Sequence, residues 1–219
     1  MTNYRARRTM LVVVLLLLLG VPLSGAVFDF PTLEEVVGYK TAPVTGDLAS
    51  LPVKGRAPKT GYSRAQFGEG WGTSLGCDTR NVILGRDLKE VMRDQSCRVV
   101  SGVLNDPYTG KQIRFTRGET TSDDVQIDHV VALSNAWQTG AQQLPYEKRI
   151  AFANDPLNLL AVEGKANENK SDGDAATWLP PNKPFRCQYV NRQIAVKLKY
   201  GLWVTAAEQA AMATVLQKC

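Results

Sequence analysis

The residues best suited to chemistry gather in two short segments of the chain. His129 is the only histidine among 219 residues, and it directly follows Asp128 in the segment IDHVVAL. In the later segment LNLLAVEGKANENKSD, Asn167 follows Asn158 by nine residues, and Lys170 comes three residues later. This last spacing places Asn167 and Lys170 on the same face of a helix. An unperturbed imidazole titrates near a pKa of about 6.5, so His129 could take or give a proton at neutral pH.

Each of these residues also has a structural interpretation. A lone histidine is more often structural than catalytic, and Asp128 could cap a turn. The two asparagines could satisfy backbone groups, and Lys170 could be a solvated helix residue. Successive strand residues face opposite sides of a sheet, so Asp128 and His129 converge only if their strand ends or twists there. The residue types alone leave both interpretations open.

Together the two segments resemble the HNH, or ββα-metal, endonucleases. That family carries Asp-His at the end of a first strand, an Asn on or after a second strand, and a His or Asn on the following helix. Asp128-His129, Asn158 and Asn167, followed by Lys170, resemble its His-Asn-Asn variant. Because several residues fall at the family spacing at once, the functional interpretation is favoured over the structural one.

A closer resemblance extends from about residue 48 onward. This part of the chain resembles secreted bacterial HNH-family proteins that share the C-terminal domain of GmrSD-type restriction enzymes. The segments that carry it are GYSRAQFGEGW, GCDTRN, DPYTG, IDHVVALSNAW, ANDPLNLLAV and WLPPN. Two features depart from the HNH pattern. Ala132 stands where proline is frequent, and the zinc-binding cysteine pairs of many HNH proteins are absent.

The resemblance implies metal-dependent hydrolysis of phosphodiester bonds. In that mechanism neutral His129 is the general base that takes a proton from water. Asp128 and Asn167 hold one Mg²⁺ through oxygen atoms, with Mn²⁺ or Ca²⁺ as alternatives, while Asn158 holds the loop and orients the imidazole. The candidates for binding flanking phosphates are Lys170, Arg80 and Arg64. The implied partner is nucleic acid, with DNA favoured and RNA as the alternative.

Two other classes of function stay open. One is a catalytically silent exported module that keeps the fold for binding or interaction. The other is an enzyme that acts on a different phosphodiester or on wall polymers. The composition, 44% hydrophobic and 21% charged, excludes bulk disorder, and one long apolar run excludes a polytopic membrane protein.

That apolar run has the features of a secretory signal peptide at residues 1–26. Three arginines precede the apolar stretch at residues 10–19, and Ser24-Gly25-Ala26 supplies small residues for cleavage after Ala26. An uncleaved anchor is the alternative, but a spanning helix needs about 20 apolar residues. Cleavage removes three arginines and no acidic residue, which lowers the formal net charge from +5 to +2. We therefore expect a secreted protein without stable membrane association.

The four cysteines all follow the leader. An even number in an exported chain favours disulfides, and four cysteines allow three pairings. We favour the pairing that is local in sequence, Cys77 with Cys97 and Cys187 with Cys219. A zinc site is disfavoured because the chain has no Cys-x-x-Cys pair.

Periodicity and turn residues predict one α+β domain at residues 61–219, behind a surface arm at residues 27–60. The arm holds a short helix at 33–39, and order begins at Gly61. Strands are expected at 97–104, 111–117, 125–131 and 157–162, with a hairpin turn at 105–110. Helices are expected at 79–93, over most of 133–153 with a break near Pro145, from 165 to 170, and at 185–200. A loop follows at 172–184, and a last helix opens at a Thr205/Glu208 capping box. The family resemblance makes this a ββα-metal, HNH-type core with flanking helices and a β-hairpin, stabilised by disulfides.

Overall fold

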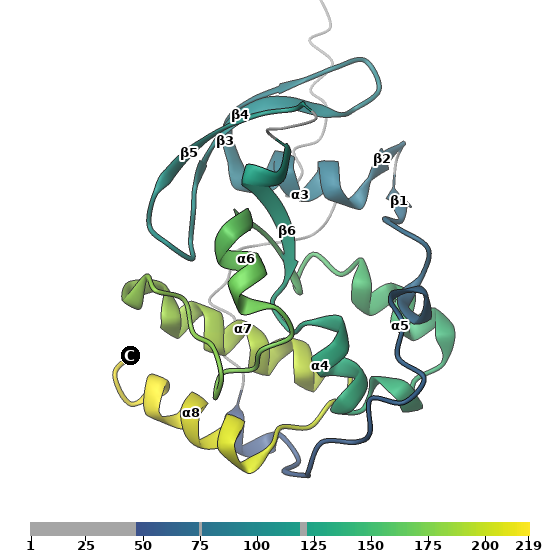
Figure 1. The fold of residues 1–219 in the computed structure, drawn as a ribbon, viewed down its shortest axis with the longest axis vertical. Helices are drawn as coiled ribbons and strands as arrows, with labels where there is room; N and C mark the ends of the chain where they lie inside the picture. Colours follow the sequence, from purple (N-terminus) through teal and green to yellow (C-terminus); the bar gives the residue numbers. More distant parts are fainter. Residues whose placement is uncertain (1–46, 75, 119–121) are drawn as a thin grey trace, which may run out of the picture. The chain divides into compact units, whose positions relative to one another are not determined.

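The computed structural model describes residues 47–74, 76–118 and 122–219, which Figure 1 draws as a coloured ribbon. The predicted signal peptide at residues 1–26 and the predicted helix at 33–39 lie outside the described residues. Helices are mixed with small antiparallel sheets along the described chain, which confirms the α+β class. None of the helices in these ranges combines the length and the hydropathy that a membrane span requires.

The central unit consists of two antiparallel strands followed by a helix. Strand β6 (Val125–His129) pairs with β7 (Leu159–Glu163), and helix α6 (Gly164–Lys170) begins directly after β7 and packs on both strands. Figure 1 shows α6 beside β6. Only glycine fits at position 164, because a Cβ there would lie 2.0 Å from the Asp123 carbonyl oxygen. The predicted strand at 125–131 ends two residues early, at His129.

A three-stranded antiparallel sheet lies next to this unit. Its order is β3 (Leu88–Arg93), β4 (Val99–Asn105) and β5 (Gln112–Thr116), and the β4–β5 pair confirms the predicted hairpin. The Asp106 side chain closes the turn by accepting hydrogen bonds from the backbone N–H groups of Tyr108 and Thr109. The inner face of the sheet packs against α3 (Thr79–Asp87) in a hydrophobic cluster.

The predicted helix at 79–93 is wrong beyond Asp87. The helix ends there, and the following residues form strand β3, in which Leu88 pairs with Leu104 of β4. Leu88 belongs to the same hydrophobic cluster as Ile83 and Leu84. The apolar spacing in 79–93 fits one continuous helix, but it also fits a short helix followed by a strand. Pairing with the edge of β4 selects the strand.

The remaining helices agree with the prediction in type and order. The expected helical region at 133–153 divides into α4 (Leu133–Gln138) and α5 (Tyr146–Ala153), with Pro145 immediately before α5. Helix α7 (Arg186–Lys199) ends just before Gly201, whose φ of 63° lies in the left-handed region. The segment at 172–184 is a loop, apart from a 3₁₀ turn that begins at Lys183. Helix α8 (Ala206–Leu216) completes the chain.

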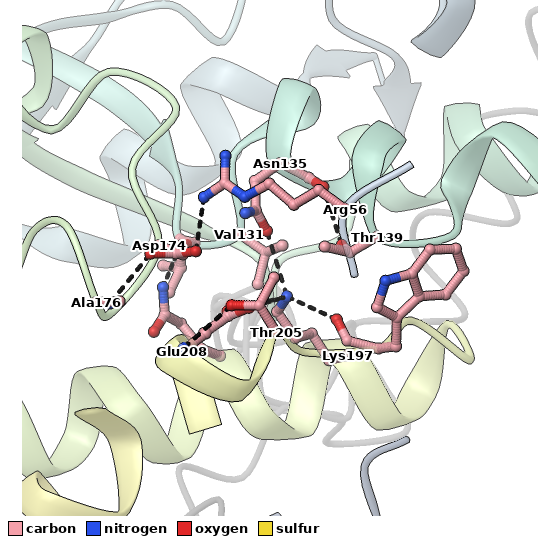
Figure 2. Close-up of polar contacts among 12 residues, drawn as sticks. Arg56, Val131, Asn135, Thr139, Asp174, Ala176, Lys197, Thr205 and Glu208 are labelled. Atoms are coloured by element: carbon pink, nitrogen blue, oxygen red, sulfur yellow. Dashed lines mark hydrogen bonds and ion pairs between the residues drawn. The ribbon is translucent and has the colours of Figure 1, made fainter. Parts of the chain in front are cut away.

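A buried ion pair ties the C-terminal helices together, as Figure 2 shows. Lys197 of α7 and Glu208 of α8 are both fully buried, with their nitrogen and oxygen atoms 2.9 Å apart. The Lys197 ammonium also donates to the Asn135 side chain of α4. One of the two hydrogen bonds of the expected capping box forms, because Thr205 accepts from the Glu208 backbone N–H. The second does not, since the Glu208 carboxylate pairs with Lys197 and not with the helix end.

Residues 47–60, part of the predicted arm, lie along this helical region. Leu51 is buried in the core, and Val53 forms a parallel bridge with Val204. The backbone N–H of Ala57 donates to the Gln138 carbonyl, and Arg56 forms an ion pair with Asp174 (Figure 2). The ordered chain thus includes residues before Gly61. The proposed domain boundaries themselves stay predictions.

Both disulfides pair as predicted. Cys77 is bonded to Cys97, and Cys187 to Cys219, with Cα–Cα distances of 5.6 and 5.8 Å. The first joins strand β2 (Cys77–Asp78) to the turn between β3 and β4, and the second joins the start of α7 to the last residue of the chain. The bridges close loops with sequence separations of 20 and 32 residues.

We expect each disulfide to raise the free energy of unfolding by about 3–4 kcal/mol, because it restricts the unfolded chain. Urea titrations of the oxidised protein and of the Cys187→Ser/Cys219→Ser and Cys77→Ser/Cys97→Ser variants, followed by tryptophan fluorescence, measure this. Identical transition midpoints with and without a reducing agent would contradict a stabilising role.

Candidate active site

His129 stands at the end of β6, where its ring is held on two sides. The side chain is only 7% exposed, and its Nε2 lies 2.9 Å from the carbonyl oxygen of Ala153, at the end of α5. A carbonyl oxygen can only accept, so Nε2 carries the hydrogen and the lone pair of the neutral ring lies on Nδ1. The indole of Trp71 stacks against the imidazole, with ring centroids 5.7 Å apart and an interplanar angle of 10°.

Burial keeps this imidazole neutral. Removal from water is the main cause that lowers the pKa of His129 to about 4; the hydrogen bond to Ala153 opposes the shift, and the nearby cations Arg64 and Lys170 contribute to it. At neutral pH the ring therefore has a lone pair available on Nδ1, which is the protonation state that a general base requires.

The carboxylate of Asp128 is buried and is held by two other segments of the chain. It accepts hydrogen bonds from the Tyr108 hydroxyl and from the Lys170 ammonium, the latter at 2.9 Å. Tyr108 comes from the β4–β5 turn and Lys170 from the end of α6, so this one carboxylate joins three elements. Burial raises the pKa of Asp128, and the charge and hydrogen bond of Lys170 oppose that rise.

Lys170 does not face the solvent, contrary to the expectation that it binds phosphate. Its side chain is fully buried, and its ammonium donates to Asp128 and, at 2.8 Å, to the backbone carbonyl oxygen of His129. A buried charge must be paired, and both partners of Lys170 belong to the strand end that presents the imidazole. In this structure Lys170 therefore holds Asp128 and His129 in place and does not line the cleft.

Asn158 forms hydrogen bonds with the backbone of the residues that follow β6. Its Oδ1 accepts from the Val131 N–H at 2.8 Å, its Nδ2 donates to the Val131 carbonyl oxygen, and its own carbonyl accepts from the Val130 N–H. The side chain is completely buried. These bonds end the strand immediately after His129, which agrees with the expectation that Asn158 holds the loop.

Asp128, His129 and Asn167 line one cleft of about 500 Å³. The amide of Asn167 donates through Nδ2 to Gln126 at 2.8 Å, and this bond fixes the orientation of its oxygen, Oδ1. The remaining lining residues are Lys59, Tyr62, Arg64, Gln126, Ile127, Ala132, Leu133, Ser134, Glu168, Ser171 and Asp172.

The donor set of this cleft fits a sparsely ligated hard cation. Within residues 47–74, 76–118 and 122–219, no group of three or more His, Cys, Asp or Glu side chains could hold a metal ion. Asp128 and Asn167, whose side chains carry oxygen atoms, nevertheless both line the cleft. A carboxylate has about four lone-pair positions, and Asp128 uses two of them for Tyr108 and Lys170. Mg²⁺ commonly takes one or two protein oxygens and keeps several waters.

The two arginine candidates, Arg64 and Arg80, lie in different surroundings. Arg64 lines the 500 Å³ cleft that contains His129. It also lines an adjoining pocket of about 140 Å³, whose other lining residues include His129 and Trp71. Arg80, on α3, donates to the backbone carbonyls of Ser122 and Val125 and lines neither cavity. Arg80 therefore holds the start of β6, whereas Arg64 lines the cleft that contains His129.

Three residues near the site were not singled out from the sequence. Tyr108 lies in the turn segment DPYTG, and neither Trp71 nor Gln126 belongs to the spaced motif of Asp128, His129, Asn158, Asn167 and Lys170. The first two stand in segments that carry the GmrSD resemblance, GYSRAQFGEGW and DPYTG. Their contacts to Asp128 and His129 depend on tertiary structure, because both come from other parts of the chain.

Lys170→Met is expected to lower the free energy of unfolding by about 3–5 kcal/mol, because it leaves the Asp128 carboxylate buried without its cation. The double variant Asp128→Asn/Lys170→Met should recover much of this loss, and Lys165→Met, on the exposed side of α6, serves as the control. Urea denaturation of the four proteins measures the effect. A Lys170→Met protein as stable as the Lys165→Met control would contradict the paired arrangement.

The single histidine permits a direct test of its pKa. In the metal-free protein we expect the imidazole proton resonances to titrate near pH 4, well below the value of about 6.5 for an exposed histidine. Between pH 4 and pH 6.5 the histidine is protonated in the unfolded chain but neutral in the folded chain. Stability contributed by neutral His129 is therefore complete above pH 6.5 and is lost as the pH falls toward 4.

Lowering the pH from 7 to 5 should cost the wild type about 2 kcal/mol more than His129→Gln. Equal losses in the two proteins would show that the imidazole is not buried in its neutral form.

Comparison with known proteins finds a family model and a relative that match the chain. A family model described as "GmrSD restriction endonucleases, C-terminal domain" matches residues 78–215. An uncharacterized secreted protein of Arthroderma benhamiae is 39% identical over 192 residues, which cover 86% of this chain and 90% of that protein. That relative is fungal, so the bacterial origin expected from the resemblance stays a prediction. No solved structure matches the chain.

The family match covers Asp128, His129, Asn158, Asn167 and Lys170, together with Tyr108. It spans more than half of the chain and includes all of the β6–β7–α6 unit. This chain therefore belongs to the family of the C-terminal domain of GmrSD restriction endonucleases.

Proposed function

We propose that this protein is a secreted, metal-dependent endonuclease of the HNH type, which hydrolyses phosphodiester bonds of nucleic acid. The observation that carries the proposal is the state of His129. Its imidazole is neutral and has its Nε2 hydrogen engaged by Ala153, and it lines a cleft together with Asp128 and Asn167. Nδ1 is then the ring atom with the lone pair for a general base.

The arrangement of elements supports an HNH-type core. Two antiparallel strands are followed directly by a helix, with His129 at the end of the first strand and Asn167 on the helix. Asn158 lies just before the second strand and closes the loop after the first. This is the order that the resemblance to the ββα-metal endonucleases implies, and membership of a restriction endonuclease family points to the same chemistry.

His129 would remove a proton from the attacking water through Nδ1. The Ala153 carbonyl keeps the hydrogen on Nε2, and the bonds of Asn158 fix the backbone on which the imidazole stands. Arg64, at the junction of the two cavities beside His129, would bind a phosphate oxygen of the substrate. The imidazole would thus act on the attacking water from a position that other hydrogen bonds hold.

Asp128 and Asn167 would hold the divalent cation, Mg²⁺ as the first choice and Mn²⁺ as the second. When bound, such an ion would stabilise the negative charge that develops on the scissile phosphate and on the leaving oxygen. Tyr108 and Lys170 fix the direction of the Asp128 carboxylate, and Gln126 fixes the Asn167 amide.

DNA is the substrate we propose first, with RNA second. We also propose export through the leader at residues 1–26, with no stable membrane association after cleavage. The relative from Arthroderma benhamiae is named as a secreted protein, and the two disulfides suit an oxidising environment.

The test is to incubate oxidised protein, residues 27–219, with supercoiled plasmid, single-stranded DNA and RNA. Each substrate is offered with Mg²⁺, with Mn²⁺ and with EDTA. We expect metal-dependent cleavage by the wild type and a loss of at least about 10²-fold in His129→Ala, the smaller end of what general base catalysis contributes.

Asn167→Ala should raise the metal concentration needed for half-maximal rate. Asn169→Ala, on the exposed side of the same helix, is its matched control and should behave as wild type. If the folded wild type leaves all three substrates intact with every metal, the nuclease proposal is wrong and a binding module takes its place.

A further inference from the structure

The stacking of Trp71 on His129 joins two distant parts of the chain. Trp71 comes from the loop Gly68–Gly72, far from β6 in the sequence, yet its ring lies nearly parallel to the imidazole. Both rings line the same pocket of about 140 Å³. An offset parallel stack restricts the plane of the smaller ring, because tilting the imidazole would drive its edge into the indole.

Helix α5 supports both halves of this contact. The carbonyl of Ala153, its last residue, binds the imidazole Nε2 hydrogen. The next residue, Asn154, binds the Trp71 loop: its Oδ1 accepts from the Gly72 N–H at 2.7 Å and from the Thr79 hydroxyl at 2.9 Å. Consecutive residues therefore hold the imidazole and the ring that packs on it.

The other end of the loop approaches the same helix. A Cβ at Gly68 would lie 3.4 Å from a side-chain carbon of Ile150, and Gly68 has a φ of 99° that favours glycine. The Arg149 guanidinium of α5 binds the Gln66 carbonyl at 2.7 Å, just before the loop. The loop is thus attached to α5 on both sides of Trp71.

The two contacts restrain different motions of the imidazole. A single hydrogen bond at Nε2 sets the direction of one atom but leaves the ring able to rotate about that bond. A flat ring against its face opposes this rotation and so restrains the direction of Nδ1 as well. Proton transfer requires Nδ1 to be aligned with the attacking water, and small misplacements of a catalytic group are costly in rate.

We propose that Trp71 is a positioning residue for the general base, and that Asn154 holds the Trp71 loop so that the indole stays stacked on the imidazole of His129. The inference rests on the proposed nuclease function. It assigns the indole to orientation of the imidazole and not to binding of a nucleic acid base. These two roles differ in kinetics, because loss of base stacking weakens substrate binding whereas loss of orientation slows the chemical step.

The experiment compares Trp71→Leu with Trp71→Phe in steady-state cleavage of a labelled DNA oligonucleotide with Mg²⁺. Leucine keeps an apolar side chain without a flat ring, and phenylalanine keeps the ring. We expect kcat to fall about 10- to 100-fold in Trp71→Leu, with KM changed by less than about 3-fold, and Trp71→Phe to restore most of the rate.

Asn154→Ala, which leaves Trp71 itself intact, should reproduce a part of the same kcat loss and provides a second route if Trp71→Leu does not fold. Lys148→Ala removes an exposed side chain from α5 and should match the wild type. Circular dichroism confirms that each variant is folded at the assay temperature.

Equal rates for wild type, Trp71→Leu and Asn154→Ala would overturn the inference while leaving the nuclease function in place. So would a rise in KM at constant kcat, which would assign Trp71 to base stacking. An inactive wild type would refute the proposed function and this inference with it.

Discussion

The buried carboxylate of Asp128 is the constraint on which the rest of the site depends. A charge removed from water must be matched, and here the match comes from Lys170 at the end of α6 and from Tyr108 in the β4–β5 turn. Satisfying one side chain therefore brings the three-stranded sheet, strand β6 and helix α6 together. Lys170 also binds the His129 carbonyl, so the backbone that presents the imidazole is fixed by the same ammonium.

Several polar residues that suggest substrate contacts are used inside the protein. Lys170 and Arg80 were candidates for phosphate binding, yet Lys170 is buried against Asp128 and Arg80 binds backbone carbonyls beside β6. Glu208 fits a capping box but pairs with Lys197 in the interior. In each case the long side chain reaches a partner from another element. Residue type and local spacing cannot reveal such a partner, because it is distant in the sequence.

Local patterns were reliable where neighbouring residues decide the structure. The turn chemistry between β4 and β5, the break at Pro145 and the end of α7 before Gly201 all follow from backbone preferences of individual residues. The pattern failed at 88–93, where apolar spacing is compatible with helix or strand and the edge of β4 selects the strand. The disulfide pairing, chosen as the local one, agrees with the structure.

The sequence by itself determined which residues could do chemistry and their order: Asp128-His129, Asn158 and Asn167 at a spacing that suits two strands and a helix. It also determined the α+β class, because periodicity and turn residues act locally. Only the tertiary structure decided the state of the imidazole. Burial lowers its pKa, the Ala153 carbonyl selects its tautomer, and Trp71 packs on its face. These effects come from segments that are brought together only by folding, so no pattern around His129 encodes them.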